Sequence, residues 1–135
     1  MEVTFEKIRE IYVNEKNEPN LAQISEDFFE KVYEYLKFKE EAYEKTKDEK
    51  ILVELKNAKR MVDEILNIRL KKIIESAIIF LKSGTLPTNL LKKEEELFFK
   101  IIDWMKEYKK EMIKLPKVKL KIKKDVPKIE LEDKE

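Results

Sequence analysis

The sequence predicts an all-α fold, a helical bundle of about four helices followed by a short extended segment at the carboxyl end. Apolar residues recur every three or four positions as far as Pro116, which is the period of an amphipathic helix. After Pro116 the period falls to two, as in a strand. The 135 residues, of which 42% are hydrophobic, can bury one modest core. We therefore expect one helical domain over residues 1–116 and a strand or linker over residues 117–135.

Polar capping residues mark where the first two helices begin. Thr4 can cap the first helix, and the polar run 14–20 closes it. Its apolar side would carry Phe5, Ile8, Ile11 and Tyr12. Ser25 is the expected cap of the second helix, since Glu26 and Asp27 then lie in the first turn, where the helix dipole favours carboxylates. The buried side of that helix would carry Phe28, Phe29, Val32, Leu36 and Tyr43.

Two longer helices are expected after the polar patch at residues 45–50, which is either a turn or a weak point in one long helix. The third helix runs from about residue 50 to 82 and ends at Ser83 and Gly84, a plausible C-cap. The fourth runs from about residue 92 to 114, and Pro116 ends it. Its apolar residues are Leu97, Phe98, Ile101, Ile102, Met105, Tyr108 and Met112.

Beyond Pro116, lysines alternate with Val118, Leu120 and Ile122, which predicts a strand over residues 117–124. The alternating lysines Lys117, Lys119, Lys121 and Lys123 form a candidate nucleic-acid contact, acting by phosphate neutralisation. No aromatic residue is interleaved to stack on bases, and no arginine is present to read them. Lysines that protect a solvated strand edge from pairing are the favoured alternative.

A charged residue lies in the apolar stripe of the third helix. On a helical wheel centred on Leu55, Arg69 falls inside the stripe and Lys72 lies at its edge. The stripe contains Ala58, Val62, Leu66, Ile73, Ala77 and Phe80. An unpaired buried charge costs several kcal/mol, so Arg69 requires an acidic partner. Glu94, on the apolar seam of the fourth helix, is the predicted partner in a structural salt bridge, with Glu26 and Asp27 as alternatives.

Composition excludes most enzyme classes. The chain has no cysteine and no histidine, and a carboxylate with a guanidinium group makes no familiar reaction. Its single glycine, Gly84, cannot build a phosphate-binding loop. We therefore predict a protein without enzyme activity, cofactor or metal. The 30 basic and 29 acidic residues give a formal net charge of +1, so any attraction to nucleic acid must be local.

The absence of cysteine fits a reducing cytosol, and the first residues lack the pattern of a signal peptide. The longest apolar run, residues 77–81, is far shorter than a membrane span of about 20 residues. We therefore expect a cytoplasmic protein without a membrane partner.

The end of the third helix is apolar on nearly every side, and a helix of this kind must be covered all round. A domain of this size has few other helices to cover it, so we predict a protein–protein interface there, with Trp104 as an anchor on the fourth helix. The predicted interface residues are Ile74, Ile78, Ile79, Leu81 and Trp104. Enclosure by the domain's own helices and the loop 84–91 is the alternative.

Residues 55–77, LKNAKRMVDEILNIRLKKIIESA, resemble the helical A-domain of GINS subunits, most of all the archaeal class related to the eukaryotic subunits Sld-five and Psf-one. Residues 24–29, ISEDFF, are similar to the family's entry into a helix but lack its proline. Residues 91–95, LKKEE, take the place of a Leu-Thr-Pro-Glu-Glu helix start. Residues 125–127, DVP, look like the opening of the family's β-rich B-domain, which this chain either lost by truncation or has in a naturally shortened form.

The resemblance implies a non-enzymatic subunit of the GINS complex in DNA replication. Such a subunit forms a tetramer with itself or with a second GINS subunit, and it joins the MCM helicase to a RecJ-like partner in association with the nucleoid. Arg69, Lys72 and Glu94 would then hold the A-domain together, and the apolar end of the third helix would contact other subunits. A generic helical interaction adaptor and a lysine-rich DNA-binding accessory protein are the alternative functions.

Overall fold

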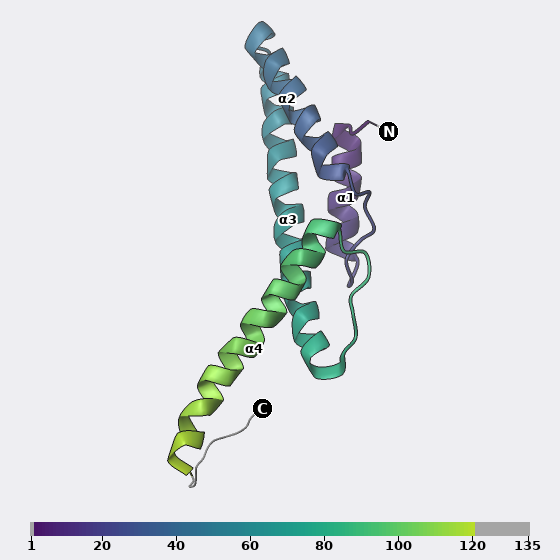
Figure 1. Ribbon diagram of the computed structural model, residues 1–135. Helices are drawn as coiled ribbons and strands as arrows, with labels where there is room; N and C mark the ends of the chain where they lie inside the picture. Colours follow the sequence, from purple (N-terminus) through teal and green to yellow (C-terminus); the bar gives the residue numbers. More distant parts are fainter. Residues whose placement is uncertain (1, 121–135) are drawn as a thin grey trace. The chain divides into compact units, whose positions relative to one another are not determined.

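The computed structural model describes the backbone of residues 2–120 and side chains as far as residue 113, and four α-helices account for its regular structure. In chain order these are α1 (Phe5–Asn17), α2 (Phe28–Thr46), α3 (Glu49–Ser83) and α4 (Lys92–Leu120) (Figure 1). The predicted all-α fold with four helices is confirmed. The chain forms two compact units, residues 1–96 and 97–135, and α4 begins in the first and continues in the second.

The first helix begins as expected, whereas the second begins later. The Thr4 hydroxyl accepts a hydrogen bond from the backbone N–H of Lys7 at 3.1 Å, so Thr4 caps α1. Ser25 does not cap α2. Its carbonyl instead accepts from the backbone N–H of Phe28 at 3.1 Å, which closes a turn, and Asp27 takes the cap position. The carbonyl of Ser25 is therefore part of a turn, whereas in the predicted cap it would accept the first hydrogen bond of the helix.

The polar patch at residues 45–50 is a tight turn between two antiparallel helices. Lys47 ends α2 in the left-handed conformation, with φ of 54°, and the Asp48 carboxylate caps α3 by accepting from the backbone N–H of Lys50 at 2.9 Å. The alternative of one long helix is therefore wrong. We call α2 and α3 together the α2–α3 hairpin.

Helix α3 is the centre of the first unit and packs against both α1 and α2. The core of the unit comprises Ile8, Ile11, Phe28, Val32, Ala58, Met61 and Ile65. The predicted buried stripe of α3 was partly wrong, because Leu66 is 45% exposed while Met61 and Ile65 are buried. The buried positions step mostly by four residues from residue 61 to residue 77, and each such step turns about 40° around the helix. A helical wheel centred on one residue does not show that the buried side turns gradually around the helix in this way.

The predicted end of the fourth helix at Pro116 and the strand after it are also wrong where the structure describes them. Helix α4 continues through Pro116 to Leu120, and residues 121–124 of the predicted strand lie outside the described residues. Proline disfavours a helix interior by about 3 kcal/mol, a local bias that a long helix of strong helix formers can absorb. The side chains of the predicted nucleic-acid contact, Lys117, Lys119, Lys121 and Lys123, lie outside the described residues, so that contact stays a prediction.

Gly84 ends α3 in the left-handed conformation, with φ of 78°, and its backbone N–H donates to the carbonyl of Phe80 at 2.8 Å. No atom within 4 Å would obstruct an added Cβ, so only backbone strain opposes a larger residue. We expect Gly84→Ala to lower the free energy of unfolding by about 1 kcal/mol in urea titrations. Lys82→Ala, on the exposed last turn, is the control and should change it little; an equal loss in both variants would contradict the capping role.

Candidate functional site

A buried ion cluster lies at the centre of the first unit. Arg69 is 1% exposed, and its guanidinium group donates five hydrogen bonds. Nε and one Nη donate to the two carboxylate oxygens of Glu94, at 2.8 and 2.7 Å. The remaining three bonds reach the Glu15 carboxylate at 2.7 Å, the Ala22 carbonyl at 2.9 Å and the Asn89 carbonyl at 3.0 Å. Guanidinium has five N–H donors, so each of them is used.

Lys72 lies one turn further along α3, and all three of its N–H donors are likewise used. Its ammonium group donates to the carbonyl of Glu15 at 2.6 Å, to the Glu15 carboxylate at 2.8 Å and to the carbonyl of Asn20 at 2.9 Å. Glu15 is fully buried and accepts a further hydrogen bond from the backbone N–H of Ala22 at 3.0 Å. The two basic and two acidic side chains of the cluster balance in charge.

Glu94 also organises the start of α4. One of its oxygens accepts from the backbone N–H of Leu91 at 2.9 Å, which is half of a capping box. Asn89 precedes this cap in the left-handed conformation, with φ of 67°, and its side-chain amide donates to the carbonyl of Leu21 at 3.0 Å. The cluster therefore fixes α1, the loop after it, the loop after α3 and the first turn of α4.

The contacts of the cluster keep its groups charged. Burial alone would raise the pKa of Glu15, but hydrogen bonds from Lys72, the Ala22 backbone and Arg69 outweigh it, so the pKa lies below its ordinary value of 4.5. Burial likewise opposes the charge of Arg69, yet the hydrogen bonds to Glu94 and Glu15 raise its pKa above its ordinary value. Because every donor of Arg69 and Lys72 is occupied, neither cation is left to bind a substrate.

The structure brings together the three residues that the sequence placed in a structural bridge, Arg69, Glu94 and Lys72. The alternative partners lie elsewhere: the Glu26 carboxylate accepts from the backbone N–H of Lys92 at 3.3 Å, and Asp27 is 3.9 Å from Lys31.

Glu15 was missed, since it falls in a polar run that the sequence reading assigned to the close of the first helix. Its spacing in the sequence could have indicated that it is buried. It follows Ile8 and Ile11 at helical intervals, on the buried side of α1.

A second feature is a row of apolar residues exposed on α3, which we call the α3 row. Its members recur every four residues and are between 37% and 45% exposed: Leu66, Leu70, Ile74 and Ile78. Ile79 beside it is 52% exposed, and Leu81 is half-buried. The row includes two of the predicted interface residues, and sequence reasoning missed Leu66 and Leu70. Apolar groups gathered in this way on a surface are typical of binding sites.

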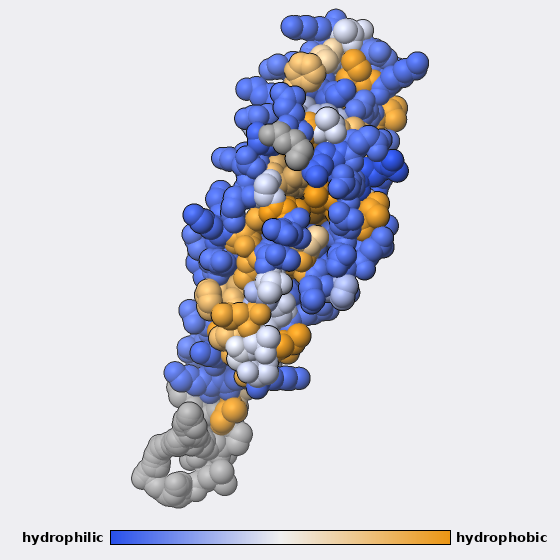
Figure 2. Space-filling model, turned by 90° about the vertical axis from the view of Figure 1, so that its right-hand side faces the viewer, coloured by the Kyte–Doolittle hydropathy of each residue, from blue (hydrophilic) through white to orange (hydrophobic). Residues whose placement is uncertain are grey.

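The second unit combines buried and exposed apolar residues within its described side chains. Phe98, Ile101 and Ile102 are buried, while Trp104 is 66% exposed and Tyr108 and Met112 are also exposed. Hydrophilic residues cover most of the face of the chain drawn in Figure 2, with hydrophobic residues visible between them.

Among the described residues no three carboxylates gather into a metal-binding group, and no helix there is long and apolar enough to cross a bilayer. The described residues thus form four helices whose buried charges bind one another, and some large apolar side chains of α3 and α4 are exposed, as is typical of helical interaction modules.

The family model for the GINS complex protein helical bundle domain (Sld5) matches residues 5–113, well over half of the chain. The chain therefore belongs to the GINS family, whose members are non-catalytic subunits of a complex in DNA replication. Family membership implies association with other GINS subunits. No curated protein matches the chain.

We expect Arg69→Met to lower the free energy of unfolding by about 3–5 kcal/mol, because it keeps much of the volume but leaves the half-buried Glu94 without its cation and the buried Glu15 with Lys72 alone. Urea titration followed by circular dichroism measures the change. The matched control is Arg60→Met, since Arg60 is on the same helix but its bridge to Glu64 is exposed; it should unfold almost like the original chain. A small loss for Arg69→Met would refute the stabilising role of the cluster.

The lowered pKa of Glu15 makes part of the stability depend on pH. Its contribution is complete above the unfolded value of 4.5 and is lost as the pH falls through the lower folded value. We therefore expect the stability difference between the original chain and Glu15→Gln to be largest near about pH 7 and to shrink below about pH 4. The exposed Glu10→Gln provides the control in urea titrations across this range, and a difference independent of pH would contradict the assignment.

Proposed function

We propose that this chain is a non-enzymatic scaffold subunit of the GINS complex, within the replicative helicase assembly that contains the MCM helicase and a RecJ-like partner. Its work is to hold other proteins in place at the replication fork, in association with the nucleoid. The family match supports GINS membership, and the saturated ion cluster supports a structural use of the buried charges. The partners beyond GINS rest on the family resemblance.

The observation that carries the scaffold proposal is the α3 row. Four apolar side chains at intervals of four residues form a ridge along one helix, and such ridges fit the grooves of a neighbouring helix. Burial of these side chains in an interface would stabilise association by removing apolar surface from water. We propose that the α3 row is the contact with another GINS subunit, either a second copy of this chain or a different subunit.

Trp104 is the proposed anchor of this assembly in the second unit. Its exposed fraction of 66% is large for a tryptophan, and Tyr108 follows one turn later on α4. Tryptophan and tyrosine carry much of the binding energy in protein interfaces, since they bury a large area while losing few rotamers. We propose that these aromatic residues contact a partner subunit independently of the α3 row.

The molar mass of the purified chain by light scattering, over a range of concentrations, tests the self-assembly form of this proposal. We expect a dimer or tetramer, and we expect Ile74→Glu combined with Ile78→Glu to return it to a monomer, because buried unpaired charges oppose association. Val13→Glu is the matched control, since Val13 on α1 has a similar exposed fraction of 42%. A chain that is monomeric at every concentration would contradict self-assembly through the α3 row.

A further inference from the structure

The α2–α3 hairpin extends past the start of α1, so that α1 covers only part of its length (Figure 1). Helix α1 begins at Phe5, and the hairpin continues beyond that point to the turn at Lys47 and Asp48. On this uncovered length Phe38 of α2 is 65% exposed and Val53 of α3 is 56% exposed. Two large apolar side chains thus lie open near the line that α1 would follow if it were longer.

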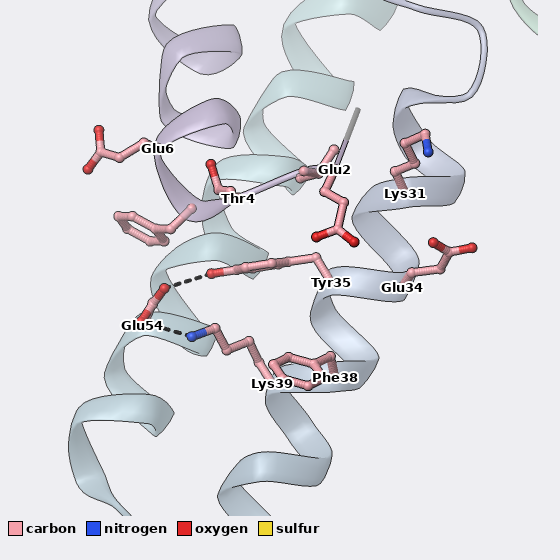
Figure 3. A pocket seen from close by; sticks show the side chains of 11 residues that line it. Glu2, Thr4, Glu6, Lys31, Glu34, Tyr35, Phe38, Lys39 and Glu54 are labelled. Carbon is pink, nitrogen blue, oxygen red and sulfur yellow. Dashed lines mark hydrogen bonds and ion pairs between the residues drawn. The ribbon is translucent and has the colours of Figure 1, made fainter.

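A cavity of about 620 Å³ lies where α1 begins, and it opens along the hairpin. Phe5, Tyr35 and Phe38 supply aromatic surface, with charged residues from the start of the chain and from α2 around them (Figure 3). A second depression, lined by Glu49, Lys50 and Val53, adjoins it and shares Phe5, Glu6 and Glu54 with it. Together they form a continuous surface that we call the hairpin groove.

The floor of the hairpin groove is held in place by hydrogen bonds. The Tyr35 hydroxyl donates to the Glu54 carboxylate at 2.8 Å, and the Lys39 ammonium is 3.4 Å from the same carboxylate (Figure 3). Burial and then the carboxylate of Glu54 raise the pKa of Tyr35, so its hydroxyl remains a donor at neutral pH. A ring fixed in this way is already arranged for binding, which reduces the entropy lost when a partner docks.

The charges around the hairpin groove are unbalanced. Four of its charged residues are paired, since Glu6 binds Arg9, Lys31 binds Asp27, and Lys39 and Glu54 bind each other. Among the described residues, the side chains of Glu2, Glu34, Glu49 and Lys50 make no ion pair or hydrogen bond, which leaves three acids against one base. The surface therefore combines exposed aromatic and aliphatic groups with a net negative rim.

We propose that the hairpin groove binds a basic amphipathic helix of a partner protein, which continues the packing line of α1 along the hairpin. Apolar residues of that helix contact Phe38 and Val53, and its lysines or arginines pair with Glu34 and Glu49. Helix-in-groove recognition of this kind uses anchors three and four residues apart. The proposal concerns residues 2–57 and does not depend on the α3 row, so either can fail without the other.

The first test uses a fluorescent helical peptide of about 16 residues, with leucines at spacings of three and four and lysines elsewhere. Fluorescence anisotropy with the full chain measures its affinity. We expect saturable binding that weakens as salt is added, and about tenfold weaker binding for Phe38→Ala. Tyr33→Ala is the matched control, because Tyr33 is also on α2 and also 65% exposed but does not line the groove. Equal weakening by both substitutions, or no binding, would overturn the proposal.

The second test separates charge recognition from adhesion to apolar surface. A peptide with glutamate at every lysine position keeps the same leucines, and we expect it to bind at least about tenfold more weakly because it faces the acidic rim. Glu34→Gln with Glu49→Gln should reduce this preference, whereas Glu30→Gln with Glu96→Gln should not. Equal binding of both peptides would overturn the proposal, as would light scattering in which Phe38→Ala dissociates a complex of this chain with itself.

Discussion

The guanidinium group of Arg69 binds α1, the loop that follows α1, the loop that follows α3 and the first turn of α4. These segments are distant in sequence, and their acceptors satisfy the five donors only when all are in place. In a buried site of low dielectric the penalty for a missing acceptor is larger than the gain from a present one. The cluster therefore selects one arrangement of these segments more strongly than apolar packing alone would.

Helix α3 both packs in the core and exposes the α3 row, because its buried side turns gradually around the helix. The residues that meet α1 and α2 turn gradually around the helix as it advances, and Arg69 lies on this path. This gradual turn leaves another side of the same helix outside the core, and the α3 row occupies it. A single helix of 35 residues thus holds the first unit together and displays the surface that we assign to subunit association.

The sequence was sufficient for the helices and for the pairing of Arg69 with Glu94, since both follow from local period and from the penalty for burying charge. It was insufficient for Glu15, because a carboxylate in a polar run becomes informative only when the loop after α1 folds back over it. The strand predicted after Pro116 was wrong over residues 117–120, where helix propensity outweighed a short alternation. The cap at Ser25 was wrong because a turn used its backbone.

The two proposed surfaces use different lengths of α3, and this separation has a functional consequence. The hairpin groove involves residues 49–57, whereas the α3 row begins at Leu66 and is followed towards the end of the helix by Ile79. The buried positions between them, Ala58, Met61 and Ile65, pack within the core. If both proposals hold, a partner helix in the groove need not compete with a subunit on the row. One rigid helix would then allow the subunit to bind two proteins at once, as a scaffold requires.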